Sequence, residues 1–217
     1  ALGELGLAPP RHRVVCVAGT NGKGTTASCI AEMLRAHGLR VGLYTSPHLI
    51  DLEERFRIDG VPAPRELVLE VGHEILGRFG GPTAEPRLTF FELTTAMAAR
   101  IFSRACADVA VYEVGLGGRL DAVNALEPDV SVITTIGFDH QEYLGETIEE
   151  ITAEKLGIAR AGCPLLVGAQ EHQGVWAAVE SRAVGRVRRA GRAFGHADDE
   201  ARGGGRVWVR PEGGGEE

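Results

Sequence analysis

Residues 13–25 have the sequence R-V-V-C-V-A-G-T-N-G-K-G-T, and this stretch decides the fold class. Residues 13–18 form a short run rich in valine, which predicts a strand. Glycines then interrupt the run, and a helix is predicted to follow from Lys23 to His37. Its apolar residues recur at helical spacing, at Ile30, Met33 and Leu34. A strand, a glycine-rich loop and a helix in direct succession predict the start of an α/β domain.

Further apolar runs predict strands at residues 40–44, 108–114, 130–135 and 164–168. Helical patterns lie between them, one of them at residues 64–79. Strands that alternate with helices indicate an α/β fold with a doubly wound, mostly parallel sheet, whose ligands bind outside the carboxyl ends of the strands. The glycine-rich loop, Ser46, Glu113 and the pair Asp139 and His140 each follow or end a predicted strand. We therefore expect them to open toward the same edge of the sheet.

Two helix starts have the spacing of a capping box, in which a Thr side chain and a Glu side chain three residues later satisfy free amides. Thr89 with Glu92 predicts a helix that ends near residue 105. Thr147 with Glu150 predicts a second helix, which should contain Lys155.

The 217-residue chain has an ordinary globular composition, with 44% hydrophobic and 24% charged residues. Its formal net charge of -7 gives no general attraction to nucleic acid or anionic lipid, so an anionic substrate must be met by a local site. The four cysteines lack C-x-x-C spacing, which favours buried thiols in a reducing cytoplasm. No apolar stretch approaches the roughly 18 residues that span a bilayer, and the first ten residues lack signal-peptide features. We expect a cytoplasmic protein with neither a membrane nor a nucleic-acid partner.

Residues 181–217 differ from the rest of the chain. The pattern of strands and helices ends there, arginine and glycine become frequent, and glycine triplets at 203–205 and 213–215 flank a short apolar run. We expect one main α/β domain at residues 1–180, followed by a mobile, solvated Arg/Gly-rich tail or linker. A contact between this tail and nucleic acid is the alternative.

The glycine-rich loop consists of Gly19, Thr20, Asn21, Gly22, Lys23, Gly24 and Thr25. Because it joins a strand to a helix, its amides and the helix N-terminus can face phosphate oxygens while Lys23 neutralises their charge. Thr25 can then ligate magnesium. The general Walker pattern has Ser or Thr directly after the lysine, and here Gly24 intervenes, so the motif is a variant. A glycine turn without a ligand is the alternative.

Several motifs together resemble the folylpolyglutamate synthase and dihydrofolate synthase branch of the Mur-ligase-like family. They are G-T-N-G-K-G-T at 19–25, T-S-P-H-L at 45–49, F-F-E at 90–92, E-V-G-L-G-G-R-L-D-A-V-N at 113–124, residues 134–140, and E-K-L-G-I at 154–158. Their occurrence in the family's order, across residues 14–170, is highly specific. The resemblance implies a fold like the Mur-ligase central domain, with ATP and two Mg²⁺ ions as cofactors.

The resemblance also implies catalytic roles for Lys23, Glu113, His140 and Lys155. It implies metal ligands at Thr25, Ser46, Glu113, His140 and Lys155. An unmodified lysine repels magnesium, but the family's matching lysine is typically carbamylated, which converts the cation into an anionic oxygen ligand suited to a hard metal. Leu156 stands where the family commonly has alanine, and this adds bulk beside Lys155.

The implied substrate-binding residues are Ser46, Pro47, His48, Phe90, Glu92 and Arg119. The loop that begins at Ser46 is expected to stay irregular through residues 51–57. Structural roles are the alternatives for several of these residues: Phe90 can pack a helix start, Glu92 can complete a cap, and Arg119 can pair with Glu113, whose burial needs a cation or hydrogen bonds. His140 can likewise be a loop histidine satisfied by backbone, and Asp121 and Asn124 can be turn formers.

The implied reaction is ATP-dependent ligation of L-glutamate to dihydropteroate or to a folate through an acyl phosphate. One alternative is a peptidoglycan Mur ligase, which Gly24 and the S-P-H-L motif disfavour, and another is a non-catalytic nucleotide-binding module. Members of the family are longer and carry a C-terminal domain that helps to bind ATP and glutamate. We therefore expect an incomplete chain, monomeric, with weak or no turnover by itself.

Overall fold

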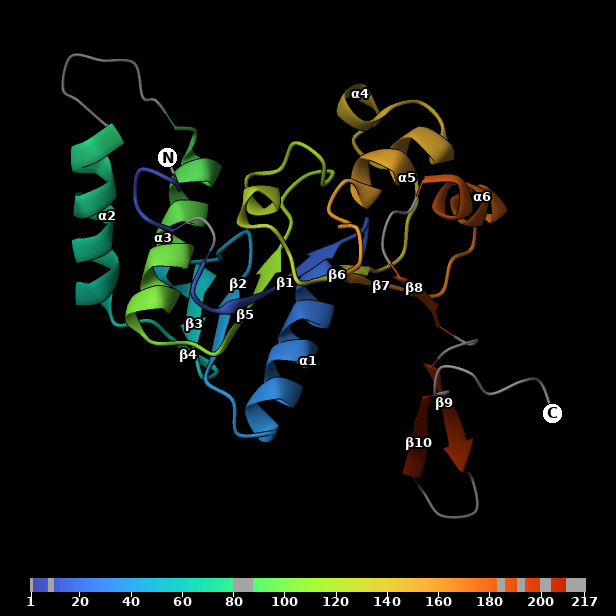
Figure 1. Ribbon diagram of the computed structural model, residues 1–217, viewed down its shortest axis with the longest axis horizontal. Helices are drawn as coiled ribbons and strands as arrows, with labels where there is room; N and C mark the ends of the chain where they lie inside the picture. The colour runs from blue at the N-terminus through green and yellow to red at the C-terminus, as the bar shows by residue number, and fades with distance from the viewer. Residues whose placement is uncertain are drawn as a thin grey trace.

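A central eight-stranded sheet organises the computed structural model, which describes residues 2–7, 10–79, 88–182, 186–190, 194–199 and 204–209. The strand order is β4-β3-β2-β5-β1-β6-β7-β8 (Figure 1). The strands are Arg13–Ala18 (β1), Val41–Tyr44 (β2), Phe56–Ile58 (β3), Val61–Pro62 (β4), Val109–Glu113 (β5), Val130–Ile133 (β6), Pro164–Val167 (β7) and Arg186–Arg189 (β8). All neighbours from β2 to β8 pair in parallel, whereas β3 and β4 pair antiparallel at one edge. The predicted α/β class with a mostly parallel sheet is confirmed.

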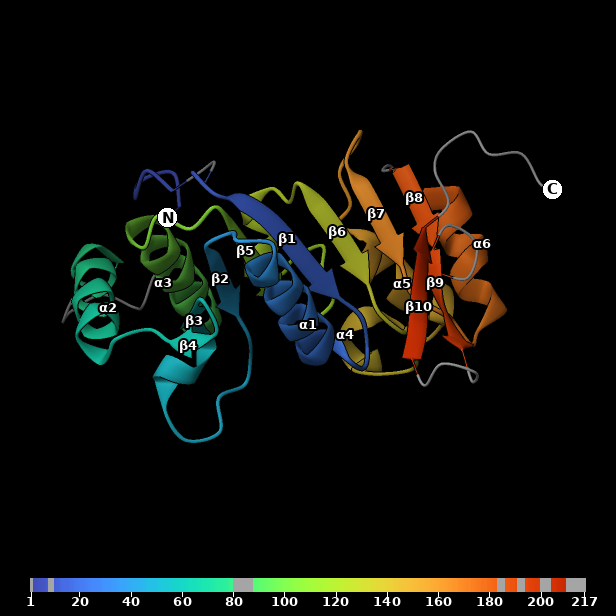
Figure 2. The same ribbon diagram turned by 90° about the horizontal axis from the view of Figure 1, so that it is seen from below.

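Helices cover both faces of this sheet. They are Lys23–Ala36 (α1), Arg65–Phe79 (α2), Phe90–Arg104 (α3), Gln141–Leu144 (α4), Ile148–Leu156 (α5) and Gln173–Arg182 (α6), with short 3-10 helices at Leu52–Arg55 (η1) and Ala122–Leu126 (η2). Helix α1 lies across one face of the sheet, and α3 and α5 lie over the other, with α2 outside α3 (Figures 1 and 2). Within the described ranges, no helix is both long and apolar enough to cross a membrane.

The strand β1 is buried on both sides because it lies between two separate apolar cores. Val14 and Cys16 belong to the larger core, which α2, α3, α5 and α6 cover. Val15 and Val17 belong to the smaller core beneath α1. A strand with helices on both faces has no solvent side, which explains its continuous apolar run.

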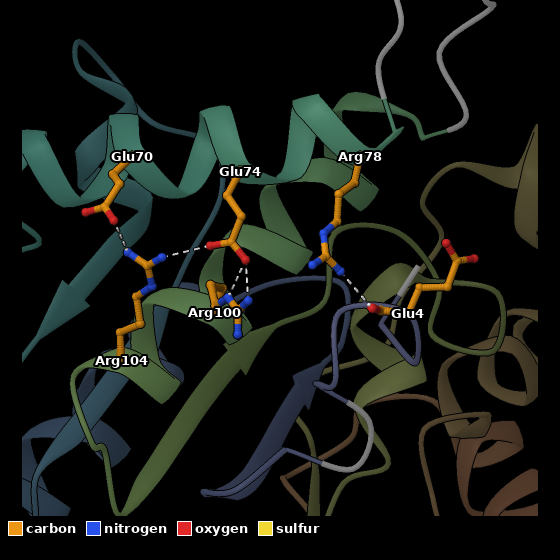
Figure 3. Close-up of polar contacts among 6 residues, drawn as sticks. All are labelled: Glu4, Glu70, Glu74, Arg78, Arg100 and Arg104. Atoms are coloured by element: carbon orange, nitrogen blue, oxygen red, sulfur yellow. Dashed lines mark hydrogen bonds and ion pairs between the residues drawn. The ribbon is translucent and has the colours of Figure 1, made fainter.

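Helices α2 and α3 are joined by ion pairs in addition to apolar packing (Figure 3). Arg104 contacts Glu70 at 2.7 Å and Glu74 at 2.8 Å, and Arg100 also pairs with Glu74. Arg78 donates to the backbone carbonyl of Glu4 at 3.0 Å, which fastens the N-terminal segment to α2. These contacts lie on α2, the outermost helix, away from the loops that follow β1 and β5.

Two sequence predictions need correction. The expected irregular loop at residues 51–57 contains η1 and the first residues of β3. The expectation that the pattern of strands and helices ends at residue 180 is wrong where the structure describes the chain, because α6 ends at Arg182, β8 extends the sheet, and Phe194–Asp199 (β9) pairs with Gly204–Val209 (β10). Backbone pairing with β7 needs no apolar pattern, so β8 left no signal in the sequence. The glycine triplet at 213–215 lies outside the described residues, and the domain boundary at 180 stays a prediction.

Candidate functional site

The glycine-rich loop occupies the turn between β1 and α1, and its backbone requires glycine at two positions. Gly19 has φ of 148° and Gly22, the N-cap of α1, has φ of 77°. A Cβ atom on Gly19 would lie 1.8 Å from the Thr134 hydroxyl oxygen, so the loop can lie against the chain after β6 only without a side chain there. The first amides of α1 are thereby left at the carboxyl edge of the sheet, where they can bind an anion.

Two lysine ammonium groups meet at this loop. Lys23 Nζ donates to the carbonyl oxygens of Gly19 at 3.2 Å and Thr20 at 3.1 Å, and Lys155 Nζ donates to the same Gly19 carbonyl at 3.0 Å. These are the two lysines of the sequence. Both lysines therefore lie where a phosphate group would need positive charge.

Lys155 is buried to 2% exposure on the inner face of α5. Burial, helped by the nearby charge of Lys23, lowers the pKa of Lys155 from 10.5 to about 8, while Asp139 acts in the opposite direction. A buried lysine with a lowered pKa is partly an uncharged amine at neutral pH, and an uncharged amine is the nucleophilic form. The predicted carbamylation needs this form, although the modification itself stays a prediction.

Glu113 ends β5 beside the loop, with only 6% of its surface exposed. The Ser46 amide donates to its Oε2 atom at 3.0 Å, and burial raises the pKa of Glu113, with the Ser46 and Gly24 amides and Lys23 acting in the opposite direction. A Cβ atom on Gly24 would lie 3.2 Å from the same oxygen. This close approach gives a physical reason for the glycine that interrupts the Walker pattern.

The predicted alternative of an ion pair between Glu113 and Arg119 does not form. Arg119 Nε instead contacts Glu154 Oε1 at 2.9 Å, with more than half of its side chain exposed. Asn124 donates to the carbonyls of Arg119 and Gly157, which holds the loop after β5 against the end of α5. Arg119 is therefore adjacent to the helix that carries Lys155, and its role in substrate binding stays a prediction.

The remaining predicted metal ligands lie at the same edge but are not joined into one cluster. Thr25 is exposed on the first turn of α1. His140 has φ of 47° at the start of α4, and its Nε2 atom is 3.6 Å from Asp139 Oδ1. In the part of the chain that the structure describes, histidine, cysteine and acidic side chains nowhere form a group of three that could hold a metal. The metal-ligand set therefore stays a prediction.

The loop after β2 is held by two charged residues that the sequence analysis did not single out. Arg55 is buried, donates through Nε to His48 Nδ1 at 2.8 Å, and lies 5.3 Å from the centroid of the Phe90 ring. Glu54 accepts hydrogen bonds from the amides of residues 49, 50 and 51. The segment that begins with Ser46 and the cis-linked Pro47 is therefore an ordered loop. The charged residues at 51–57 gave no local sequence signal that two of them would hold this loop in place.

A cavity of about 400 Å³ lies between the start of α3 and the loop after β5. Its lining includes Phe91, Glu92, Leu116, Asp121, Tyr143 and Leu144. The predicted capping role of Glu92 is confirmed, because it accepts from the Thr89 amide at 2.7 Å. Phe90, by contrast, does not line this cavity, and 56% of its surface is exposed.

Asp121 gives this cavity a half-buried carboxylate. Asp121 accepts from the amides of Gly115, Leu116 and Val123, which confirms its predicted role as a turn former. Burial raises its pKa, and these amides act in the opposite direction. The wall of the cavity therefore combines an aromatic ring with a carboxylate.

A second cavity, of about 510 Å³, lies against the glycine-rich loop. Asn21, Gly22 and Thr26 form one wall, and the ends of β6 and β7 with Gly168 and Ala169 form the other. The lining is largely apolar, with polar atoms near the loop. This second cavity therefore adjoins the loop that carries the phosphate-binding signature.

Comparisons with known proteins agree with this arrangement. Residues 17–164 match the model of the Mur ligase middle domain. The dihydrofolate synthase/folylpolyglutamate synthase of Haemophilus influenzae is 44% identical over 165 residues, which cover 76% of this chain and 37% of that protein.

Two solved structures have the same fold. Escherichia coli FolC in complex with DHPP and ADP has a TM-score of 0.82 and 38% identity, covering 91% of this chain and 47% of that chain. A bifunctional folylpolyglutamate synthase/dihydrofolate synthase with Mn, AMPPNP and L-glutamate bound has a TM-score of 0.82 and 36% identity, covering 96% and 49%. This chain thus spans less than half the length of these three relatives.

Proposed function

This chain belongs to the family of the Mur ligase middle domain, and on that premise we propose that it binds Mg-ATP and a pterin-type carboxylate for glutamate ligation. The whole reaction would join L-glutamate to dihydropteroate or to a folate. The curated relative is named a dihydrofolate synthase/folylpolyglutamate synthase, which favours this branch over peptidoglycan synthesis.

One observation carries the proposal: two lysines and a buried glutamate converge on one phosphate-binding loop. Lys23 and Lys155 share the Gly19 carbonyl, and the Glu113 carboxylate lies against Gly24. Cations together with helix amides suit the phosphates of a nucleotide, and a carboxylate beside them suits the metal that accompanies those phosphates.

The donor set fits a hard divalent cation. Glu113 is buried, and within the described residues it forms no ion pair; its negative charge is offset by amides and by the more distant cations Lys23 and Arg55. We propose that Glu113 holds the ion together with the hydroxyl groups of Ser46 and Thr25, and that a second ion lies toward His140. When bound, magnesium would offset negative charge on the phosphates.

The residues of the chain would act mainly by positioning. The amides of the glycine-rich loop would hold the phosphates, and Lys23 would lie beside the γ-phosphate as negative charge builds up on it. Attack by the substrate carboxylate on that phosphate gives an acyl phosphate and ADP, and the amine of glutamate then displaces phosphate. The apolar cavity beside Asn21 would take the nucleoside.

The cavity beside Phe91 is the proposed site of the pterin ring. An aromatic wall can stack on a flat heterocycle, and the Asp121 carboxylate can accept hydrogen bonds from ring N–H and amino groups. The ordered loop of Ser46, Pro47 and His48 would lie along the rest of the substrate. Arg119 lies at the end of α5, where it could meet a substrate carboxylate after leaving Glu154.

Two finer proposals concern the state of the protein. We propose that Lys155 is carbamylated when the metal site is filled, supported by its burial and lowered pKa. We also propose a cytoplasmic location, supported by cysteines that are all free thiols. The monomeric state expected from the sequence stays a prediction.

Calorimetric titration of Mg-ATP into this chain and its Lys23→Ala variant tests the proposed function, first alone and then with dihydropteroate present. We expect binding that the variant loses and that dihydropteroate tightens. Arg11→Ala is the matched control, since Arg11 is an exposed cation that precedes β1, at the opposite end of the strand from the glycine-rich loop. Equal binding by the wild-type chain and Lys23→Ala would contradict the proposal, and binding indifferent to dihydropteroate would favour a nucleotide-binding module without ligase chemistry.

A further inference from the structure

Gln170 ties the chain after β7 to the chain after β6. Its Oε1 atom accepts from the Ile136 amide at 2.9 Å, and its Nε2 atom donates to the carbonyls of Thr134 at 2.5 Å and Gly168 at 3.1 Å. One amide side chain thus makes three hydrogen bonds to backbone groups just beyond the last paired residues of β6 and β7. Neither the motifs of the sequence nor the comparisons assign a role to this residue.

The backbone that Gln170 holds is the one that holds the glycine-rich loop. Thr134 Oγ1 donates to the Asn21 carbonyl at 2.7 Å, and the Thr20 amide donates to the Thr135 carbonyl at 2.7 Å. The Thr20 side chain also exchanges hydrogen bonds of 3.1 Å with the backbone of Gly137. The segment 134–137 therefore connects Gln170 to the loop, since it is hydrogen-bonded to both.

These contacts decide which way one peptide group of the loop faces. In a trans peptide the carbonyl oxygen and the following N–H point in opposite directions. Because the Asn21 carbonyl is turned toward Thr134, the Gly22 N–H is turned away from Thr134. A flip of this peptide would present a carbonyl oxygen to a phosphate in place of a donor.

We propose that Gln170 is a positioning residue of the nucleotide site, which keeps the Gly22 amide facing the phosphates by holding Thr134 and Thr135 in place. The inference rests on the proposed function, because it assumes that the loop binds nucleotide phosphates. Gln170 touches no phosphate itself and acts through the chain after β6.

The first test is hydrogen exchange of backbone amides by NMR, on the whole chain without ligand, comparing wild type with Gln170→Ala. The proposal predicts faster exchange at Ile136, which loses its acceptor, and also at Thr20, which Gln170 does not touch. Gln141→Ala is the control, since Gln141 is an exposed glutamine with one long hydrogen bond of 3.4 Å. Faster exchange at Ile136 with no change at Thr20 would show a purely local role and would overturn the proposal.

The second test is the affinity for Mg-ATP, measured well below the unfolding temperature. Gln170→Ala is expected to bind about tenfold more weakly, a change that corresponds to roughly 1.4 kcal/mol. Gln170→Glu keeps the acceptor for Ile136 but faces the Thr134 carbonyl with a second acceptor, so it should also bind Mg-ATP more weakly than wild type. Wild-type affinity in both variants would overturn the proposal.

The two tests separate this inference from the proposed function. If the wild-type chain binds no Mg-ATP, the proposed function fails, and the exchange rate at Thr20 still decides whether Gln170 positions the loop. If the wild-type chain binds Mg-ATP and both Gln170 variants match it, the proposed function stands and the inference fails.

Discussion

Replacing Lys155 by methionine is expected to stabilise the unliganded chain at neutral pH while damaging its site. Lys155 is buried to 2% exposure, and its pKa is lowered from 10.5 to about 8, mainly because burial disfavours the charged form. At pH 7 the folded chain therefore carries a buried charge that the unfolded chain keeps in water. Methionine fills a similar volume without that charge.

The magnitude follows from the shift. A change from 10.5 to about 8 corresponds to roughly 3 kcal/mol, at about 1.4 kcal/mol for each pKa unit. Methionine also loses the hydrogen bond from Nζ to the Gly19 carbonyl, which is worth about 1 kcal/mol. We expect Lys155→Met to raise the free energy of unfolding at pH 7 by roughly 2 kcal/mol.

The sign of the pH dependence distinguishes this cause from general repacking. Because the folded pKa lies below the unfolded one, the unfolded chain binds more protons between about pH 8 and 10.5, and the wild type gains stability as pH rises through this window. The advantage of Lys155→Met should therefore be full below pH 8 and shrink above it.

Urea unfolding of both proteins from pH 6.5 to 10 measures this difference, in buffers purged of carbon dioxide so that Lys155 stays an amine. Taking the difference between the two proteins cancels the titration of tyrosines and cysteines that they share. Arg11→Met, which removes an exposed cation, should change little at any pH. A methionine variant less stable than wild type at pH 7, or an advantage that stays constant to pH 10, would refute the reasoning.

Gly19→Ala should lower the free energy of unfolding by roughly 2–4 kcal/mol in thermal or urea unfolding, because its Cβ atom would lie 1.8 Å from Thr134 Oγ1 and its φ is 148°. Wild-type stability in this variant would mean that the loop is not packed against the chain after β6. Glu113→Gln should keep the fold and lose Mn²⁺ binding in the presence of ATP, measured by electron paramagnetic resonance; unchanged binding would place the ion elsewhere. Phe91→Ala should weaken dihydropteroate binding about tenfold in a fluorescence titration and leave Mg-ATP binding intact, since the ring lines the first cavity and not the cavity beside Asn21; equal losses for both ligands would indicate a general collapse of the site.

The sequence predicted well those elements that depend on residues close together in the chain. The strand β1 and helix α1 were predicted to within a residue because a valine-rich run, glycines and helical spacing follow one another directly. The two capping boxes at Thr89 and Thr147 were confirmed because each involves only neighbouring residues. The nearness of Ser46 to Glu113 followed from the rule that parallel strands end at one edge.

The rest depends on contacts between distant parts of the chain. The polar strand β8 is a strand because β7 offers it a backbone to pair with, which its own arginines do not reveal. The Gln170 side chain is hydrogen-bonded to Ile136, which lies 34 residues earlier in the sequence. Arg119 forms an ion pair with Glu154 and not with Glu113, which is nearer in the sequence. The packing of the folded chain determines which distant residues form such contacts, so they could not be predicted from the sequence alone.

The central claim is that the loop at residues 19–25 and Glu113 together bind a metal–nucleotide complex. The most direct measurement is anomalous difference density for Mn²⁺ in a crystal of this chain grown with a non-hydrolysable ATP analogue. The account predicts phosphates against the Gly22–Thr25 amides and a manganese peak within about 2.3 Å of a Glu113 carboxylate oxygen, the distance of a direct metal–oxygen bond. Nucleotide bound elsewhere, or manganese on the phosphates but remote from Glu113, would contradict it.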